Sequence, residues 1–276
     1  VTATGATFSS NVTGHGGATV TDVGFYYSTS ESVDPETSKK VSQKYAKDAF
    51  SSTVNDLSIY TKYYVKAFAT NAAGTAYSAV VSFTTLASTP VVKTISSSEV
   101  KAKSANLSGT VVTDNGSAIT ERGFVWVKGT ETPTSASNKL KASGTTGDFS
   151  ATLTGLEPSQ KYSFRAYATN AKGTTYGEVM NFTTTPDAMT LTTAKATSIT
   201  DVAASVGGSI TYYGGNEVTE VGVCWSTGQT PTVADSRKAA STVAKDFTVS
   251  LTGLTQHTTY YARSYATAKS GVTYYG

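Results

Sequence analysis

One stretch of eleven residues is written three times in this chain, and the copies lie one domain length apart. The copies are "FATNAAGTAYS" (68–78), "YATNAKGTTYG" (167–177) and "YATAKSGVTYY" (265–275). Gly24, Gly123 and Gly222 keep the same register, with 99 residues between neighbours. A repeat of this length matches a domain and is too long for one turn of a solenoid. The chain of 276 residues therefore predicts three copies of one fold.

Each copy has the pattern of β-structure from end to end. Thr, Tyr, Val and Phe are frequent, and they suit half-buried pleated surfaces. Short alternating runs are broken by Gly, Pro, Asn and Asp about every 8–12 residues, which is typical of β-sandwiches. In the middle copy the predicted strands cover 104–112, 119–127, 147–156, 161–170 and 174–184. No segment has the apolar period of a helix, so the predicted fold class is all-β.

The repeated stretch itself predicts a hairpin. Tyr162, Phe164, Ala166 and Ala168 alternate along one strand and point to one face, which we expect to be the core. The sequence "NAKG" (170–173) then favours a turn, since Asn starts turns through its side chain and Gly adopts positive φ. The stretch is thus the last hairpin of a small sandwich.

A Leu stands six residues before a Tyr at the start of this strand in every copy. The pairs are Leu57–Tyr63, Leu156–Tyr162 and Leu254–Tyr260. This arrangement resembles the tyrosine corner, and with "LTGLEPSQKYSFRAYATNAKGTTYGEVMNFTT" (153–184) it resembles fibronectin type III domains. More narrowly, the chain is similar to the fibronectin-like repeats of surface lipoproteins from Bacteroidota-type bacteria. The resemblance covers nearly the whole chain and implies immunoglobulin-like sandwiches in tandem. It departs from the animal pattern because Trp126 and Trp225 stand on the third strand instead of the second.

The register of the repeat divides the chain into three expected domains. They are 1–86, which lacks a first strand, 87–185, which is complete, and 186–276, which lacks a last strand. This pattern suggests an interior piece of a longer array. The connections "LASTP" (86–90) and "TPDA" (185–188) are short and contain Pro, so we expect them to restrict bending.

Charge and motifs argue against several functions. The net charge of +3 forms no strong basic field, so we expect no nucleic-acid partner. The single Cys224 excludes an internal disulfide, and no apolar run approaches the length of a membrane span. No nucleophile elbow or phosphate loop occurs, and His15 and His257 fall at unlike positions in different copies. We therefore expect no catalytic residue, no metal and no cofactor.

A cation and an aromatic residue recur on the strand face opposite Tyr162. They are Arg165 and Tyr167 in the second copy, Arg263 and Tyr265 in the third, and Lys66 and Phe68 in the first. If Trp126 and Trp225 share this face, they would extend it into a platform on which a sugar ring could stack. The alternative is a cation–π ladder that merely covers the sheet, and its presence in every copy favours this structural explanation.

Loops at the ends of the sandwiches are the other candidate binding surface. The most variable ones are 29–40, 128–139 and 226–238. Tyr212 and Tyr213 stand beside two glycines in "TYYGGNE" (211–217), where they could contact a sugar or a protein. Local packing of the two rings is the competing interpretation.

These observations favour a non-catalytic extracellular spacer, stalk or adhesion module on a bacterial surface. Its partners would be other domains of the same longer chain, and a polysaccharide or another surface protein. A glycan-binding surface protein of a polysaccharide-uptake system is the first alternative. A structural component of a virion or surface filament is the second.

Overall fold

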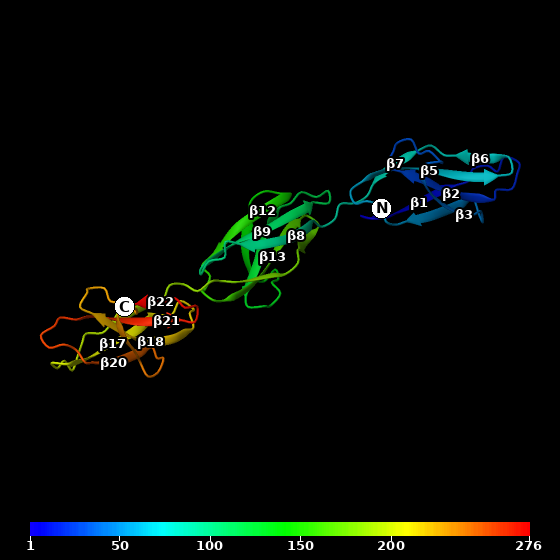
Figure 1. Ribbon diagram of the computed structural model, residues 1–276. Helices are drawn as coiled ribbons and strands as arrows, with labels where there is room; N and C mark the ends of the chain where they lie inside the picture. The colour runs from blue at the N-terminus through cyan, green and yellow to red at the C-terminus, as the bar shows by residue number, and fades with distance from the viewer.

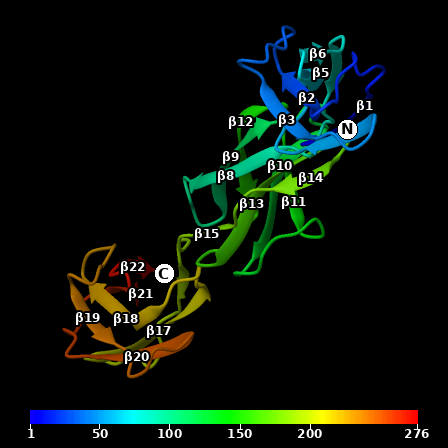
Figure 2. The same ribbon diagram turned by 90° about the vertical axis from the view of Figure 1, so that its right-hand side faces the viewer.

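The computed structural model describes all residues, 1–276, and contains 22 strands and no helix. The strands form three successive units, each with its own core, and the units follow one another end to end (Figure 1). The view turned by 90° keeps the same order, from the first unit at one end to the third at the other (Figure 2). No helix is present that could cross a membrane.

Unit 1 has seven strands and unit 2 has eight. Those of unit 1 are β1 (Ala6–Asn11), β2 (Asp22–Ser28), β3 (Lys39–Lys44), β4 (Ala49–Val54), β5 (Lys62–Asn71), β6 (Gly74–Tyr77) and β7 (Val81–Thr84). Those of unit 2 are β8 (Val91–Ser98), β9 (Ser104–Thr113), β10 (Glu121–Lys128), β11 (Asn138–Ala142), β12 (Gly147–Thr154), β13 (Lys161–Asn170), β14 (Gly173–Tyr176) and β15 (Met180–Thr183).

Unit 3 repeats this order with seven strands. They are β16 (Thr190–Thr193), β17 (Ala203–Tyr212), β18 (Val218–Ser226), β19 (Ser236–Ala239), β20 (Asp246–Thr252), β21 (Tyr261–Ala268) and β22 (Thr273–Tyr275). All three units are antiparallel throughout, which confirms the all-β prediction.

Every unit consists of two sheets. In unit 2 the sheets have the order β12-β9-β8 and β11-β10-β13-β14, with β15 also paired to β13. Unit 1 has β1-β4 opposite β3-β2-β5-β6, with β7 on β5, and unit 3 has β16-β17-β20 opposite β19-β18-β21-β22. Unit 1 thus has no counterpart of β8, and unit 3 has no counterpart of β15.

The core of each unit lies between its two sheets. In unit 2, Leu107, Phe124 and Phe164 are fully buried at its centre. Tyr162, Phe164, Ala166 and Ala168 all belong to this core, so the predicted alternation along this strand is confirmed. The predicted turn is also present, because Gly173 has a φ of 139° and the Asn170 side chain accepts a hydrogen bond from the Lys172 N–H.

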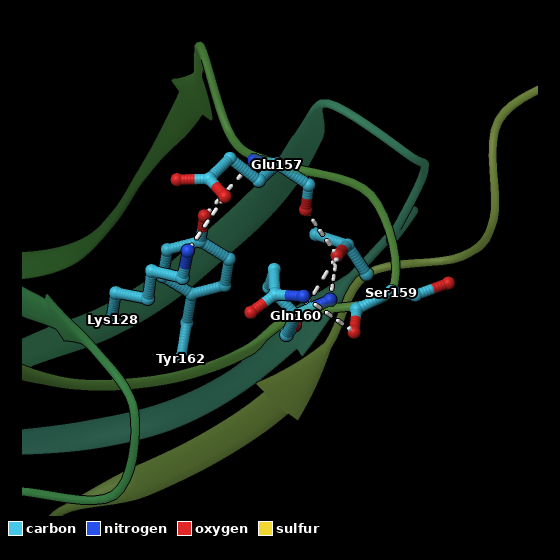
Figure 3. A network of polar contacts seen from close by, with 6 residues as sticks. Lys128, Glu157, Ser159, Gln160 and Tyr162 are labelled. Atoms are coloured by element: carbon cyan, nitrogen blue, oxygen red, sulfur yellow. Dashed lines mark hydrogen bonds and ion pairs between the residues drawn. The ribbon is translucent and has the colours of Figure 1, made fainter. Parts of the chain in front are cut away.

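The tyrosine corner is present in all three units. The Tyr162 hydroxyl accepts a hydrogen bond of 2.9 Å from the backbone N–H of Glu157 (Figure 3). Tyr63 and Tyr260 accept equivalent bonds from Ser58 and Thr255, at 3.0 and 3.2 Å. In unit 2 the side chain of Glu157 also pairs with Lys128 at 2.6 Å. The corner thus ties the connection between the sheets to the core strand.

Removing the corner hydroxyl by Tyr162→Phe is expected to destabilise unit 2 by about 1–2 kcal/mol, because the Glu157 N–H loses its partner while the ring stays in place. Chemical denaturation followed by Trp126 fluorescence, in a background with Trp225→Phe so that only unit 2 is observed, measures this. Tyr176→Phe is the matched control in the same unit, since the Tyr176 hydroxyl makes no hydrogen bond. Equal losses for both variants would contradict a role for the corner bond.

The strands of unit 2 differ from the predicted ones in two details. The pattern predicts one strand over 174–184, but this stretch forms β14 and β15, which pair with different parts of β13. The break at Gly177 lies where β8 packs against both strands, and a Cβ on Gly177 would lie 2.6 Å from Thr94 Oγ1. The pattern does not predict β11, because its exposed polar residues resemble the loop before it.

The open edge of unit 1 is built differently from its counterparts. Gly177 of unit 2 faces β8 so closely that it has no room for a side chain. Gly109 is equally crowded, with Ala166 and Phe149 of the core at 2.9 and 3.0 Å from a Cβ built on it and Lys93 O of β8 at 3.2 Å. Unit 1 has Ser10 and Ser78 at these positions. The Ser78 hydroxyl accepts the hydrogen bond of Ala67 N–H at 2.9 Å, whereas Thr94 of β8 accepts the equivalent bond in unit 2. Unit 1 therefore supplies from within the unit the contact that β8 makes in unit 2.

Candidate functional site

The two tryptophans do not lie on the predicted platform. Trp126 packs against the core of unit 2, with its ring centroid 5.8 Å from that of Tyr162, and Trp225 packs against the core of unit 3. Trp126 shares a strand face with Phe124, which is fully buried. The expectation that these rings could join Arg165 and its neighbours on the outer face is therefore wrong.

Tyr167 and Tyr265 do lie on the outer face, but they are fully buried there. Tyr167 lies directly opposite Gly123 on the neighbouring strand, and Tyr265 lies opposite Gly222 in the same way. Because glycine has no side chain, the aromatic residue opposite it can cover the exposed backbone. This arrangement explains why a glycine recurs every 99 residues: Phe68 covers Gly24 in the same way in unit 1.

The hydroxyls of these tyrosines are held by carboxylates. Tyr167 donates to Glu121 and Tyr265 donates to Glu220, both at 2.7 Å. Burial, followed by these carboxylates, raises the pKa of both tyrosines far above the ordinary value. Lys141 and then Tyr167 lower the pKa of Glu121. Both rings are neutral and covered, so neither offers a free face for a sugar.

The cations of the outer face stack on other aromatic residues. Arg165 lies 4.2 Å from the ring centre of Tyr176, and Arg263 lies 4.7 Å from that of Tyr275. Lys66 makes the same contact with Tyr77 in unit 1, at 4.6 Å. The ladder is thus present in all three units, and its geometry supports the structural explanation.

Tyr212 and Tyr213 lie at the connection between units 2 and 3. The Tyr212 hydroxyl donates to Asp187 at 3.4 Å, and Lys103 of unit 2 lies 5.6 Å from the centre of its ring. Lys103 also forms an ion pair with Asp187. Tyr213 is 40% exposed, and its carbonyl accepts a bond from Asn216. Tyr212 therefore belongs to a contact between units.

The two connections between units are built from the same hydrogen bonds in the same register. At the first, Tyr60 N–H donates to Leu86 O (3.4 Å) and Ser88 N–H donates to Asn115 O (3.1 Å). At the second, the bonds are Ser159 N–H to Thr185 O (3.3 Å) and Asp187 N–H to Gly214 O (2.7 Å). Each residue of the second set lies 99 positions after its counterpart. We call these two sets the junctions.

Only one residue separates the two bonded positions of each linker. It is Ala87 at the first junction and Pro186 at the second, where the proline ring also restricts φ. Side chains add to the first junction: Asn115 donates to Thr89 O at 2.7 Å and Asn170 donates to Ser88 O at 2.8 Å. The linkers are therefore bonded almost along their whole length.

A loop contact between units accompanies each junction. The ring of Tyr60 lies against Gly116, where a Cβ would overlap the ring. The counterparts Ser159 and Gly215 meet in the same way, with Ser159 Cβ 2.8 Å from a Cβ built on Gly215. Both glycines have positive φ, 77° and 75°. Close approach and backbone conformation together require glycine here.

The second junction should loosen in acid. Lys103 holds the pKa of Asp187 below its ordinary value, so the ion pair is intact above about pH 4 and is lost as the pH falls through the lowered pKa. Fluorescence energy transfer between dyes on units 2 and 3 should therefore show a broader distance distribution near pH 2. Asp187→Asn should show the broad distribution at pH 7 as well. A variant that stays narrow at pH 7 would contradict the role of the pair.

Sequence reasoning missed two polar clusters. In unit 1, His15 Nε2 lies 2.8 Å from Asp48 Oδ1, and the Tyr45 hydroxyl donates to the same oxygen at 2.6 Å. Hydrogen bonds from Tyr45 and then His15 lower the pKa of Asp48. The cluster is exposed and joins two loops that are 30 residues apart in the sequence, so no local sequence pattern predicts it. No group of three potential metal ligands occurs in the structure.

The second polar cluster that was not predicted from the sequence is centred on Arg122. It is only 6% exposed, and it donates to four backbone carbonyls of one loop, those of Ser143, Thr145, Thr146 and Gly147, at 2.8–3.2 Å. Its guanidinium also lies 4.7 Å from the ring centre of Phe149. Desolvation lowers the pKa of Arg122. The residue fixes the β11–β12 loop and does not face a ligand cavity.

The strand orders and tyrosine corners define three tandem fibronectin type III-like β-sandwiches. Among solved structures, the chain is similar to the crystal structure of the chicken CNTN1 FN1-FN3 domains. That comparison covers 99% of this chain and 91% of the other, with 15% identity and a TM-score of 0.39. No family model matches the sequence, and no curated protein sequence matches it.

Proposed function

We propose that the chain is a non-catalytic spacer that holds its two ends apart at a set distance on a cell surface. The observation that carries the proposal is the pair of junctions, in which the same backbone hydrogen bonds recur 99 residues apart and leave one free residue per linker. Because the same bonds and the same loop contact recur at both boundaries, we expect each unit to have a similar orientation relative to the one before it. Such an array extends along one direction (Figure 1).

The mechanism of a spacer is mechanical. The bonds of Ser88 and Asp187 hold each linker to the unit that follows it, so bending is confined to the one free residue. At the second junction, bending also separates Lys103 from Asp187. Each exposed contact contributes little alone, because solvent screens a surface ion pair. Several contacts around a one-residue linker act together to limit the angles that the junction can adopt.

The test compares junction variants with the unchanged chain by small-angle scattering and inter-unit energy transfer. Tyr60→Asn removes the ring but suits the positive φ at this position, 46°. Lys103→Ala removes the ion pair of the second junction, and Tyr261→Ala is the matched control away from both. We expect an extended chain with narrow distance distributions, broadened only by the junction variants. Broad distributions in the unchanged chain would overturn the proposal.

The location follows from the proposed role and from the resemblance to surface proteins: we place the spacer outside the cell, in contact with flanking domains. A glycan-binding role has less support, because the rings of Tyr167 and Tyr265 are covered and Trp126 and Trp225 pack on the cores. Among the predicted tyrosines, Tyr212 and Tyr213 are exposed, at 39% and 40%, and a polysaccharide screen with Tyr213→Ala as control tests that alternative.

A further inference from the structure

The larger sheet of unit 2 presents four cations on its outer face. Lys139 and Lys141 of β11, and Lys161 and Arg165 of β13, alternate along their strands with residues that pack in the core, so they lie on the side away from it. Glu121 is the one acidic residue on the strands of this face. Unit 2 has all eight strands and lies between the other two units, so this face is the surface of a complete sandwich. We call such a surface a cationic face.

Unit 1 has a cationic face of the same kind. Lys40 and Lys44 of β3 and Lys62 and Lys66 of β5 lie on the outer side of its larger sheet, since Val41, Tyr63 and Val65 between them face the core. The accompanying acid is again a single residue, Asp22, at the position of Glu121.

The smaller sheets of these two units lack such a charge. In unit 2, β8, β9 and β12 carry one cation, Lys93, and one acid, Asp148, among Ser, Thr and Asn residues. In unit 1, β1 and β4 have no charged residue. The whole chain has 22 cations and 19 acids, so its small excess of positive charge is concentrated on the larger sheets.

Two of the cations stand in a row that the repeat preserves. Lys139 lies opposite Val125, and Val125 lies opposite Arg165, so the two cations are two strand spacings apart, about 10 Å. The equivalent pairs are Lys40 with Lys66 in unit 1 and Arg237 with Arg263 in unit 3. Every unit thus presents two positive charges at the same spacing.

Carboxylates neutralise only part of the cationic face of unit 2. Glu121 pairs with Lys141 and, at 3.7 Å, with Lys139, so one acid serves two lysines. The side chain of Lys141 is nevertheless 69% exposed. Lys161 and Arg165 form no ion pair with any carboxylate. The face therefore keeps a surplus of positive charge in contact with solvent.

Structural roles account for some of these cations but not for all. β11 and β3 are edge strands, where lysine prevents pairing with another chain. Arg165 stacks on Tyr176. Neither role applies to Lys161, which is exposed on the inner strand β13 and lies over no aromatic ring. The residue 99 positions earlier is also a lysine, Lys62.

We propose that the cationic faces of units 1 and 2 bind an acidic polysaccharide. Charge complementarity selects a polyanion, and the spacing selects its class. Duplex nucleic acid carries about one charge per 1.7 Å of its axis and is bound through dense phosphate contacts. An acidic polysaccharide carries its charges on successive or alternate sugars, which suits cations about 10 Å apart on a flat sheet.

This binding would go beyond the spacer role, because a spacer needs no ligand on its faces. It uses charge and does not require a free aromatic ring, so the covered rings of Tyr167 and Tyr265 do not oppose it. A polymer that contacts the faces of two linked units binds more tightly than it would bind either face alone.

Titration calorimetry of the whole chain against polysaccharides tests the proposal. The probes are heparin, which is sulfated, polygalacturonate, which is carboxylated, and neutral dextran. We expect saturable binding to at least one acidic polysaccharide, weakened by salt, and no binding to dextran. The two acidic probes show which anionic group is preferred. Binding to neither of them, or tighter binding to single-stranded DNA or polyglutamate, would overturn the proposal.

Charge-matched variants locate the site. Lys141→Gln with Lys161→Gln removes two charges from the cationic face of unit 2 and should weaken binding at least about tenfold. Lys93→Gln with Lys101→Gln removes two exposed charges of the same unit away from that face and should stay within about twofold of the unchanged chain. Circular dichroism verifies that both double variants fold. Equal losses would show that binding follows net charge alone and would overturn the assignment to this face.

Discussion

Gly24→Ala is expected to unfold unit 1 selectively, with a loss of about 3 kcal/mol in its free energy of unfolding. A Cβ at this position would overlap the carbonyl oxygen of Val41, and it would lie 2.8 Å from both Ser42 Cα and Phe68 Cε1. Gly24 pairs with Ser42 on one side and Phe68 on the other. The added methyl group therefore forces β3 away from β2 and displaces the ring that covers the glycine.

The matched control is Gly14→Ala in the same unit. Gly14 has no atom within 4 Å of a Cβ and no positive φ, so we expect a change within about 0.5 kcal/mol. Hydrogen exchange read by mass spectrometry separates the units, because unit 1 should lose protection while 87–276 keep it. Similar protection in the two variants would show that the strands of unit 1 can shift to accept the methyl group.

Arg122→Met is expected to destabilise unit 2 by about 3 kcal/mol, because a buried charged group with four carbonyl acceptors is lost. Methionine keeps much of the apolar stem that packs on Phe149. The loss should appear in denaturation followed by Trp126, in a background with Trp225→Phe so that only unit 2 is observed. The loop 143–147 should also lose its exchange protection.

Lys128→Met on the same strand is the control for charge. Lys128 is 47% exposed and pairs with Glu157 on the surface, so its loss should cost less than about 1 kcal/mol. Arg122→Lys should destabilise unit 2 nearly as much as Arg122→Met does, because a lysine ammonium cannot donate to several carbonyls at once as the planar guanidinium does. Full stability of Arg122→Lys would show that the charge suffices without the hydrogen bonds.

The architecture was predictable because it depends on local patterns that the chain repeats. The alternation of Tyr162, Phe164 and Ala166 identifies the buried strand, and the Leu156–Tyr162 spacing identifies the corner, from the order of residues alone. Repetition strengthens each of these patterns, because three copies agree on it. Strand β11 was not predicted, because both of its faces are largely exposed and its sequence has no apolar alternation.

The exposure of the candidate binding residues was harder to predict, because alternation divides a strand into two faces without indicating which face is inside. Trp126 and Phe124 lie two residues apart on β10, so they must share a face. Only packing against the opposing sheet makes this face the core. Tyr167 was correctly placed on the outer face, yet Glu121 and Gly123 of the neighbouring strand bury it there.

By itself the sequence determined the number of units, their all-β fold, the tyrosine corners and the positions where glycine recurs. The tertiary structure alone decided that Tyr212 belongs to a junction, that Arg122 holds a loop, and that Tyr167 is buried on the outer face. The physical reason is distance along the chain. Repeats, turns and alternation depend on neighbouring residues, whereas junctions, buried charges and covered rings arise between segments that only folding brings together.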